Sequence, residues 1–448
     1  MNDETRPPQP PSAARALPVP ASRLARLAQL GSMTAGVAGN MAAEGAARLS
    51  RGERPAMREL LLTPQNVRRI TDQLAKMRGA AMKIGQLVSM DTGDMLPPEL
   101  ADIMARLRED AHFMPPTQLK KVLSSNWPDG WQRHFARFET RPIAAASIGQ
   151  VHRARLKDGR DLAIKVQYPG VVRSIDSDVA NVGALIRMSG LLPSGFELAP
   201  YLDEARKQLH EETDYQREGA HLAYFGQLLA DRTDFCVPFY HPDWSTLDVL
   251  AMTFVEGRPI EECSGAPQEE RDRIIEALIR LLMDELFTFH VMQTDPNFAN
   301  YRYDPASNRI LLLDFGATRE IPVDLVAKYR RLMRAGLNAD AEGMAAAACD
   351  IGFLSETVAK EHRDQIMVMM KLAFGELGRH EVISFAETTI PEQMQTRGAA
   401  LAESGFVPPP VPMDVLYLQR KFAGIFLLGA RLKARVQVRR LMEPFLAD

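Results

Sequence analysis

The spacing of apolar residues between Thr63 and Met90 predicts one helix. Apolar side chains recur there every three or four positions, so they form a single stripe along the helix. The stripe consists of Val67, Ile70, Leu74, Met77, Ala81, Ile84 and Val88. Lys83 and Gln86 fall off this stripe and are neighbours on another face. By residue type alone, Lys83 would be a solvated surface lysine.

Between residues 135 and 167 the pattern shortens to that of β-strands. Phe135–Ile143, a second strand ending at Leu156, and Leu162–Val166 are predicted to pair, with a turn at Lys157–Arg160. Further short strands are predicted at Val237–Tyr240, Leu247–Phe254 and Ile310–Leu313.

Tyr201–Ala230 has the pattern of one long helix with several acidic residues. Its Asp214 and Glu218 lie four positions apart on one face and repel each other, which indicates cationic partners nearby. Lys165 is the natural partner for one acid and Lys83 for the others; a solvated acidic face is the alternative. Helices are also predicted at Glu269–His290 and from Leu325 onward, with interruptions at Pro391 and Pro408–Pro410 and a last helix at Asp414–Met442.

Composition narrows the class of protein. A chain of 448 residues exceeds one typical core, and a net charge of −3 argues against a general nucleic-acid binder. The three cysteines, Cys236, Cys263 and Cys349, lie far apart, which suits a reducing compartment and offers no metal site built from cysteines. No apolar run approaches the roughly 20 residues that a spanning helix needs.

The first residues have a different composition from the rest. Residues 1–22 are rich in proline and alanine and predict no packed structure. Ser22–Ala47 then predicts an amphipathic helix, preceded and accompanied by arginines such as Arg15 and Arg26. This helix either attaches to an anionic membrane surface or packs on the body of the protein.

The chemistry that the chain can perform is indicated by Phe289–Gly316. Asp295 and Asn300 are five residues apart, and a predicted strand then leads to Asp314-Phe315-Gly316. This layout is typical of a kinase phosphoryl-transfer site, where the asparagine and the second aspartate hold Mg²⁺ and the first aspartate orients the attacking group. Oxygen ligands suit Mg²⁺ because it is a hard cation. An isolated Asp-Phe-Gly is also an ordinary turn, which is the alternative.

The predicted hairpin supplies the nucleotide-binding features. Ala144–Gly149 stands where a kinase carries a glycine-rich loop over the phosphates, and Lys165 follows in the next strand, where it would reach the α- and β-phosphates. Alanines replace the first two glycines at Ala144 and Ala146, so Gly149 alone remains. The added methyl groups restrict the backbone and crowd its approach to phosphate. We therefore expect a nucleotide pose different from that in protein kinases.

The segment after Gly316 lacks the part of a protein kinase that binds a peptide substrate. Ala317–Pro322 passes almost at once into another helix, without the long loop that docks a peptide in protein kinases. Asn297 stands two residues after Asp295, where many protein kinases carry a lysine. The sequence therefore predicts the residues for phosphoryl transfer but no loop that binds a peptide substrate.

Four segments together resemble the UbiB/ADCK family of atypical kinase-like proteins. They are Lys83–Gln86, Ala144–Gly149, Glu212–Asp214 and Gln293–Asn297, and the resemblance extends over about residues 60–445. The motifs Gln293–Asn297 and Asp314–Arg319 look closest to those of the mitochondrial and α-proteobacterial branch, which supports ubiquinone biosynthesis. The resemblance implies an atypical protein-kinase-like two-lobe α+β fold with a helical N-terminal extension. The expected divisions are a flexible or amphipathic segment (1–54), the extension (55–130), an N-lobe (131–257) and a C-lobe (258–448).

The resemblance also implies roles for single residues. Lys165 would pair with Glu218, and Lys83, beside Gln86, would face Glu212 and Asp214 across the cleft where a peptide normally binds. Asp295 would be the catalytic aspartate, with Asn300 and Asp314 as ligands of Mg²⁺. The expected binding set for ATP or ADP is Ala144, Ala145, Ala146, Ser147, Ile148, Gly149, Val151, Lys165, Met252, Val255, Asn300 and Asp314.

Family members are thought to act as membrane-associated ATPases or small-molecule kinases in isoprenoid-quinone synthesis. The resemblance therefore implies an adenine nucleotide, an anionic membrane surface, and quinone-biosynthesis enzymes or lipid intermediates as partners, with a homodimer as one option and no nucleic acid. We expect a cytoplasmic protein that is peripheral on a bacterial inner membrane, attached through its N-terminal region and without a transmembrane span. Two alternatives stay open: a protein kinase, and a nucleotide-binding scaffold without turnover.

Overall fold

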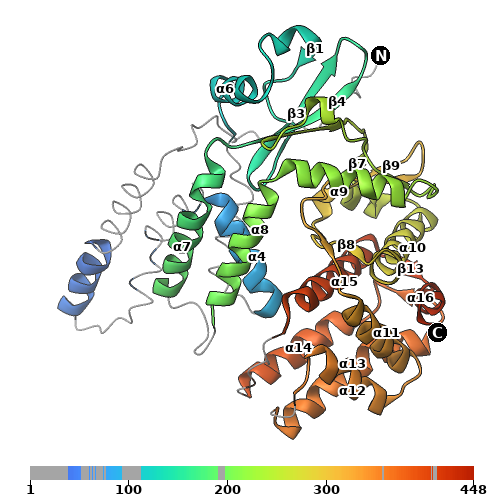
Figure 1. The fold of residues 1–448 in the computed structure, drawn as a ribbon. Helices are drawn as coiled ribbons and strands as arrows, with labels where there is room; N and C mark the ends of the chain where they lie inside the picture. The colour runs from blue at the N-terminus through green and yellow to red at the C-terminus, as the bar shows by residue number, and fades with distance from the viewer. Residues whose placement is uncertain are drawn as a thin grey trace. The chain divides into compact units, whose positions relative to one another are not determined.

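The computed structural model describes residues 39–51, 60, 63, 66, 74, 77–92, 113–189, 197–355, 358–404, 406 and 411–447 (Figure 1). Within these residues the chain divides into two compact units. The N-terminal unit extends to Ala220 and includes Phe239–Phe254, and the C-terminal unit comprises His221–Pro238 and the chain from Val255 onward. The last of these boundaries lies between Phe254 and Val255.

An antiparallel sheet of five strands forms the centre of the N-terminal unit. Its order is β1-β3-β4-β6, with β2 added to β3. The strands are β1 (Phe135–Phe138), β2 (Ala144–Ala145), β3 (Gly149–Leu156), β4 (Asp161–Gln167) and β6 (Val249–Thr253). The hairpin expected between β3 and β4 is present. The first strand is shorter than predicted, since β1 ends at Phe138. Glu139 N still donates to Arg153 O at 2.9 Å, and after Pro142, which has no N–H to donate, Ile143 N donates to Val151 O at 2.8 Å.

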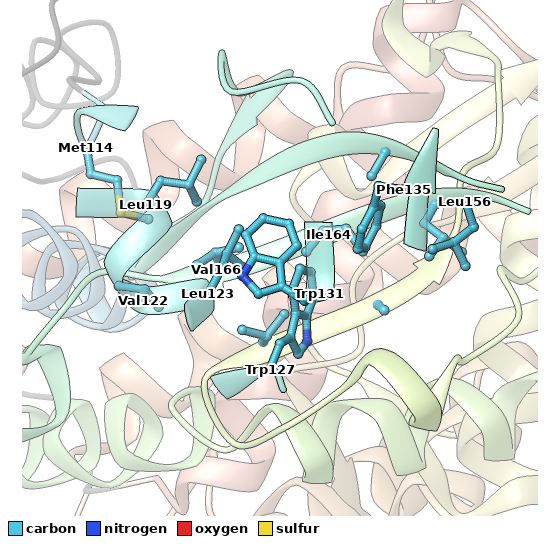
Figure 2. Close-up of a cluster of buried hydrophobic side chains, with 14 residues drawn as sticks. Met114, Leu119, Val122, Leu123, Trp127, Trp131, Phe135, Leu156, Ile164 and Val166 are labelled. Carbon is cyan, nitrogen blue, oxygen red and sulfur yellow. The ribbon is translucent and has the colours of Figure 1, made fainter. Parts of the chain in front are cut away.

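The two faces of this sheet have different surroundings. Leu162, Ile164 and Val166 of β4 point to one face, where they pack with α6 (Pro116–Asn126) and the following Trp127 and Trp131 (Figure 2). Trp127 stacks on Phe135 with ring centroids 5.4 Å apart. Successive side chains of a strand alternate between faces. Lys165 therefore lies on the opposite face, away from this aromatic core.

Helices make up the rest of the N-terminal unit. These are α4 (Arg78–Thr92), α7 (Val171–Ser189), α8 (Ala199–Glu212) and the first part of α9 (Tyr215–Leu228). Helices α4, α7 and α8 pack against one another (Figure 1). The predicted apolar stripe is buried at Leu74, Met77, Ala81 and Ile84, as expected. Val67, Ile70 and the side chain of Val88 lie outside the described residues, as does most of Ser22–Ala47, of which residues 39–47 are helical.

The long helix predicted at Tyr201–Ala230 is wrong, because the chain forms two helices there. Thr213 Oγ1 donates to His210 O at 2.7 Å, and Asp214 Oδ1 accepts the N–H of Arg217 at 2.9 Å. These side-chain to backbone bonds end α8 and cap the start of α9. Asp214 is thus the N-terminal cap of α9, the helix whose first turn carries Glu218.

The C-terminal unit combines small sheets with many helices. Its four-stranded sheet has the order β5-β10-β9-β7, and β8 pairs with β11. The strands are β5 (Phe235–Cys236), β7 (Arg258–Pro259), β8 (Val291–Gln293), β9 (Tyr301–Asp304), β10 (Arg309–Leu312) and β11 (Thr318–Glu320). The helices are α10 (Gln268–Asp284), α11 (Val323–Leu337), α12 (Ala341–Ile351), α13 (Lys360–Arg379), α14 (Ile390–Glu403), α15 (Met413–Leu432) and α16 (Val438–Leu446).

The last predicted helix, Asp414–Met442, is also divided in two. Helix α15 ends at Leu432, and Lys433 adopts a left-handed conformation with φ 52°. The chain then forms β13 (Arg435–Val436), which pairs with β12 (Ile383–Ser384), before α16 begins. Helix α15 packs beside α10 (Figure 1). None of the helices in the described part of the chain is long and apolar enough to cross a bilayer.

Candidate active site

Lys165 and Glu218 form a close ion pair in the N-terminal unit. Lys165 Nζ donates to Glu218 Oε1 at 2.8 Å and to Oε2 at 2.9 Å, and the two side chains are 9% and 5% exposed. Strand β4 presents the lysine and the first turn of α9 presents the glutamate. Nζ also lies 5.1 Å from the centre of the Tyr215 ring. Charge-assisted bonds to both carboxylate oxygens fix the position of the ammonium group.

Three of the expected nucleotide residues share the face of the sheet that carries this pair. Val151 of β3 is the register partner of Lys165, and Met252 of β6 is the partner of Ala163, two positions earlier in β4. Because alternate residues of a strand point to the same face, Val151, Lys165 and Met252 are all on the face opposite the aromatic core. Val255 belongs to the other unit.

Lys83 is buried, so the solvated-lysine alternative is wrong. Only 7% of the residue is exposed, and its ammonium group forms an ion pair with Glu212 at the end of α8. The other carboxylate oxygen of Glu212 accepts the hydroxyl of Ser147 at 2.8 Å. Asp214, which was also expected to face Lys83, accepts the N–H of Arg217 at the start of α9 through Oδ1, and its role opposite Lys83 stays a prediction. Gln86 lies half-buried, nearly one turn after Lys83 on α4.

The alanine-rich loop is held by hydrogen bonds to β3, within its own turn and to Glu212. Ala144 and Ala145 pair with Val151 and Gln150, and the Ala146 N–H donates to Gly149 O at 2.9 Å. Ser147 is bound to Glu212. The Ala146 N–H, which a phosphate-binding loop would point at the ligand, is therefore used within the turn.

The last two loop residues have packing roles. The Ile148 side chain is buried, and a Cβ at Gly79 of α4 would lie 3.1 Å from its Cγ2. A Cβ at Gly149 would lie 2.4 Å from Val166 O and 2.9 Å from Tyr215 Oη. Glycine is required at position 149 because the neighbouring strand leaves no room for a side chain. Any contact of Ile148 with a nucleotide stays a prediction and would involve its main chain.

Asp295 and Asn300 are in direct contact in the C-terminal unit. Asn300 Nδ2 donates to Asp295 Oδ2 at 3.1 Å. Both residues lie in the connection between β8 and β9, and Asn300 ends a short 3₁₀ turn, Phe298–Asn300. Asn297 caps that turn by accepting the N–H of Ala299 at 3.1 Å. The spacing seen in the sequence thus corresponds to a compact loop with an internal hydrogen bond.

Asp314 is placed next to this loop by a main-chain bond. Leu313 N donates to Asn300 O at 3.0 Å, so the residue before Asp314 is joined to the asparagine. Asp314 Oδ1 accepts the N–H of Gly316 at 3.0 Å, and Phe315 is buried with its ring centroid 4.9 Å from that of Phe225. Thr294 N and Oγ1 both donate to Ala317 O, at 3.1 and 2.7 Å. Asp-Phe-Gly is therefore part of a connected site.

The side chains of Asn300 and Asp314 fit a magnesium ion. The amide nitrogen of Asn300 is directed at Asp295, so the amide oxygen of Asn300 is the atom that can bind a cation. Asp314 adds carboxylate oxygens from a neighbouring position. Mg²⁺ is commonly held by one or two such side chains together with phosphate oxygens and water. Both residues would hold the ion from the C-terminal unit.

Helix α15 contributes residues to this site that the sequence reasoning missed. Arg420 Nη2 donates to Asp295 Oδ1 at 2.8 Å. Lys421 is almost fully buried and donates to Gln293 O at 2.7 Å and to the Tyr301 hydroxyl at 3.1 Å. One signal in the sequence could have revealed Lys421: it interrupts the apolar spacing of Leu418, Ile425 and Leu428. Arg420 has no comparable local signal.

Burial and neighbouring polar groups have opposite effects on the pKa of Lys421. Burial alone lowers the pKa of this lysine, but the Glu285 carboxylate and the Tyr301 hydroxyl outweigh that effect, and its pKa lies above the ordinary value. Burial raises the pKa of Tyr301. Lys421 is therefore a permanent positive charge beneath the loop that carries Asp295.

The fold, the Lys165–Glu218 pair and the cluster of Asp295, Asn300 and Asp314 define an α+β protein of the kinase-like class. The ABC1 atypical kinase-like domain matches residues 106–348. The chain belongs to this family, which confirms the resemblance to UbiB/ADCK proteins. It is 38% identical to the atypical kinase COQ8 of Saccharomyces cerevisiae mitochondria over 433 residues, which cover 96% of this chain and 86% of that protein.

Two further relatives extend the comparison. The mitochondrial atypical kinase COQ8B of Rattus norvegicus is 37% identical over 447 residues, 97% of this chain and 83% of that protein. Among solved structures, that of Rv3197 with erythromycin, from Mycobacterium tuberculosis, aligns with a TM-score of 0.59 and 22% identity, over 85% of this chain and 95% of that one. At this identity the structural likeness concerns the fold.

Proposed function

We propose that this chain is a Mg²⁺-dependent, ATP-hydrolysing, atypical kinase-like enzyme that supports ubiquinone biosynthesis at a membrane surface. The observation that carries the nucleotide part is the buried pair of Lys165 and Glu218, whose ammonium group is held by both carboxylate oxygens. In kinases the equivalent lysine contacts the α- and β-phosphates, and its partner glutamate keeps it in place. The relatives named as atypical kinases support the same class of reaction.

The contacts of three other residues support the roles that we propose for them. Asn300 and Asp314 would hold Mg²⁺, which neutralises charge on the phosphates when it is bound. Asp295 would accept a hydrogen bond from the attacking water and orient its oxygen toward the γ-phosphorus. The new P–O bond forms as the bond to the β,γ-bridging oxygen breaks, giving ADP and inorganic phosphate, and the water proton is released to solvent.

The segment after Asp-Phe-Gly supports a small acceptor over a peptide. Between Gly316 and the start of α11 at Val323 the chain forms β11, which pairs with β8. It therefore provides no extended loop on which a peptide could be aligned. The hydrogen bonds of the alanine-rich loop support a different point, a nucleotide pose unlike that in protein kinases, since Ala146 uses its N–H internally and Ser147 is bound to Glu212.

The ubiquinone and membrane parts of the proposal come from the family. COQ8 relatives match almost the whole chain, and the UbiB/ADCK branch that it resembles serves ubiquinone synthesis. Prenylated intermediates of that synthesis are apolar and reside in the bilayer, so the enzyme would work at its surface. Acidic phospholipids would attract the arginine-bearing N-terminal region.

The test is Mg²⁺-dependent ATP turnover by the purified protein, with and without anionic liposomes. Asp314→Asn should abolish turnover, whereas Asp324→Asn, an equal change at an exposed position of α11, should leave it unchanged. We expect anionic liposomes to raise the rate. A second arm asks whether Asp295→Asn still restores growth of a quinone-deficient strain.

Each outcome separates the proposal from its alternatives. No ATP turnover together with complementation by Asp295→Asn would replace the enzyme by a nucleotide-binding scaffold. Transfer of phosphate to a partner protein, lost in Asp295→Asn, would instead identify a protein kinase. Equal rates with and without anionic liposomes would reject the membrane part alone.

A further inference from the structure

Asp295 receives one hydrogen bond on each carboxylate oxygen. Asn300 Nδ2 donates to Oδ2 at 3.1 Å, and Arg420 Nη2 donates to Oδ1 at 2.8 Å. The first donor lies five residues away in the same loop, whereas Arg420 lies 125 positions later, on α15. The Arg420 and Asp295 side chains are 20% and 22% exposed, so the pair is partly shielded from water. A charge-assisted bond in this setting is stronger than one on the open surface.

The helix that carries Arg420 is itself fixed against the loop. Lys421 binds Gln293 on one side of Asp295 and Tyr301 on the other. One turn after Arg420, a Cβ at Gly424 would lie 2.3 Å from Pro296 Cβ, which means that the helix backbone directly contacts the loop. Arg420 therefore reaches Asp295 from a rigid support and loses less side-chain entropy than a surface arginine would.

The loop itself supplies a neutral residue where many kinases supply a cation. Asn297, two positions after Asp295, uses its side-chain oxygen to cap the 3₁₀ turn by accepting the Ala299 N–H. The guanidinium of Arg420 brings positive charge to Asp295 from a different element. Its planar fork binds one carboxylate oxygen in a defined direction, which a flexible ammonium group would do less well.

We propose that Arg420 is a positioning residue for phosphoryl transfer. It fixes the rotation of the Asp295 carboxylate so that the carboxylate aligns the attacking oxygen. This inference rests on the proposed function, since it assigns a role within that reaction. Misplacement of an orienting group by about 1 Å can lower a rate roughly 100-fold. The expected effect of losing Arg420 is accordingly on turnover, and nucleotide binding should change little.

The experiment compares Arg420→Ala and Arg420→Lys with wild type in ATP turnover, with kcat and KM determined separately. We expect Arg420→Ala to lower kcat roughly 10- to 100-fold with little change in KM for ATP, because the missing contact orients the attacking oxygen. Arg420→Lys should keep an intermediate rate. Millimolar guanidine hydrochloride should restore part of the rate to Arg420→Ala by placing a guanidinium ion beside Asp295.

The control is Arg431→Ala, on the same helix. Arg431 is 59% exposed and pairs with Glu261 at 3.3 Å, not with Asp295, so its removal should leave kcat unchanged and guanidinium should have no effect. The double variant Asp295→Asn with Arg420→Ala should be no slower than Asp295→Asn alone if the arginine acts through the aspartate.

Several results would overturn the inference. Arg420→Ala with the kcat of wild type would do so, as would a raised KM with unchanged kcat, which would make Arg420 a nucleotide ligand. A loss of rate that guanidinium does not relieve, together with a lower melting temperature, would make Arg420 a structural residue. If wild type itself has no turnover, the proposed ATPase fails first, and the role of Arg420 in it fails with it.

Discussion

Lys421 and Glu285 form an ion pair in the interior of the C-terminal unit, with Nζ 3.4 Å from Oε2 and side-chain exposures of 2% and 1%. Glu285 begins a π-helical turn, Glu285–Phe289, and its other oxygen accepts the Gln293 N–H at 3.1 Å. The pair thus joins α15, the end of α10 and the strand that leads to Asp295. Single π-turns inside helices occur often at functional sites, where they redirect side chains.

We predict that Lys421→Met strongly destabilises the C-terminal unit. The change leaves the Glu285 carboxylate buried without its cation, which typically costs about 3–5 kcal/mol of unfolding free energy. Adding Glu285→Gln should restore part of this loss, since the remaining groups are then neutral. Calorimetry of the single and double variants measures both effects.

The matched control for this prediction is Lys328→Met. Lys328 also lies 3.4 Å from its partner, Asp324, but that carboxylate is 73% exposed. Exposed pairs contribute about 0–1 kcal/mol, so this change should be nearly neutral. Equal losses in the two methionine variants would show that burial of the Lys421 pair has no special consequence.

We predict that Gly424→Ala displaces the loop that carries Asp295. The new Cβ would lie 2.3 Å from Pro296 Cβ, so helix or loop must shift. Overpacking of this kind costs about 1–3 kcal/mol, and the shift should also lower ATP turnover. Gly398→Ala in α14 is the control, because that Cβ meets nothing within 4 Å and alanine favours a helix by up to about 1 kcal/mol. A Gly424→Ala protein as stable and active as wild type would refute the close contact.

We predict that Gly149→Ala destabilises the N-terminal unit by about 1–3 kcal/mol through overpacking. Its Cβ would lie 2.4 Å from Val166 O, a main-chain atom of the adjacent strand that cannot easily move. All three tryptophans of the chain, Trp127, Trp131 and Trp244, belong to this unit, so urea unfolding followed by tryptophan fluorescence reports on it.

Ala146→Gly, in the same loop, provides the comparison for Gly149→Ala. This opposite change removes a methyl group and should cost about 0.5–1 kcal/mol through backbone entropy alone. If the two variants unfold at the same urea concentration, the packing explanation for Gly149 is wrong.

We predict that the N-terminal unit loses stability as the pH falls from 6.5 toward 4. Burial lowers the pKa of His152 from 6.5 to about 4. Its Nδ1 donates to Glu139 O, and its Nε2 accepts from Gln150, whose oxygen is used by Met114 N. In this pH range the unfolded chain binds a proton that the folded chain does not, so acid favours unfolding.

The size of this effect follows from the shift in pKa. One pKa unit corresponds to about 1.4 kcal/mol, so the loss reaches roughly 3 kcal/mol near pH 4. Urea unfolding at several pH values, for wild type and His152→Gln, measures it. The variant is less stable at neutral pH but should show a shallower pH dependence below 6.5. Parallel pH profiles for the two proteins would exclude His152 as the source.

Local patterns revealed most of the candidate site. Asp295, Asn300 and Asp314 are identified by their spacing within one short stretch, because a compact loop must bring such residues together. Lys165 is identified by its place in a strand after the hairpin, since alternation along a strand fixes the face on which its side chain lies. The buried stripe of Leu74, Met77, Ala81 and Ile84 follows from helical periodicity.

The sequence by itself determined the chemical groups of this protein, because their spacing reflects strands, turns and helices that form over a few residues. Tertiary structure alone decided which distant groups meet them. Helix α15 packs on a loop 125 positions earlier and brings Arg420 to Asp295. The break between α8 and α9 likewise makes Asp214 a helix cap, which accepts the N–H of Arg217. Packing of this kind depends on the shapes of whole helices and loops, so the spacing of residues along the chain does not predict it.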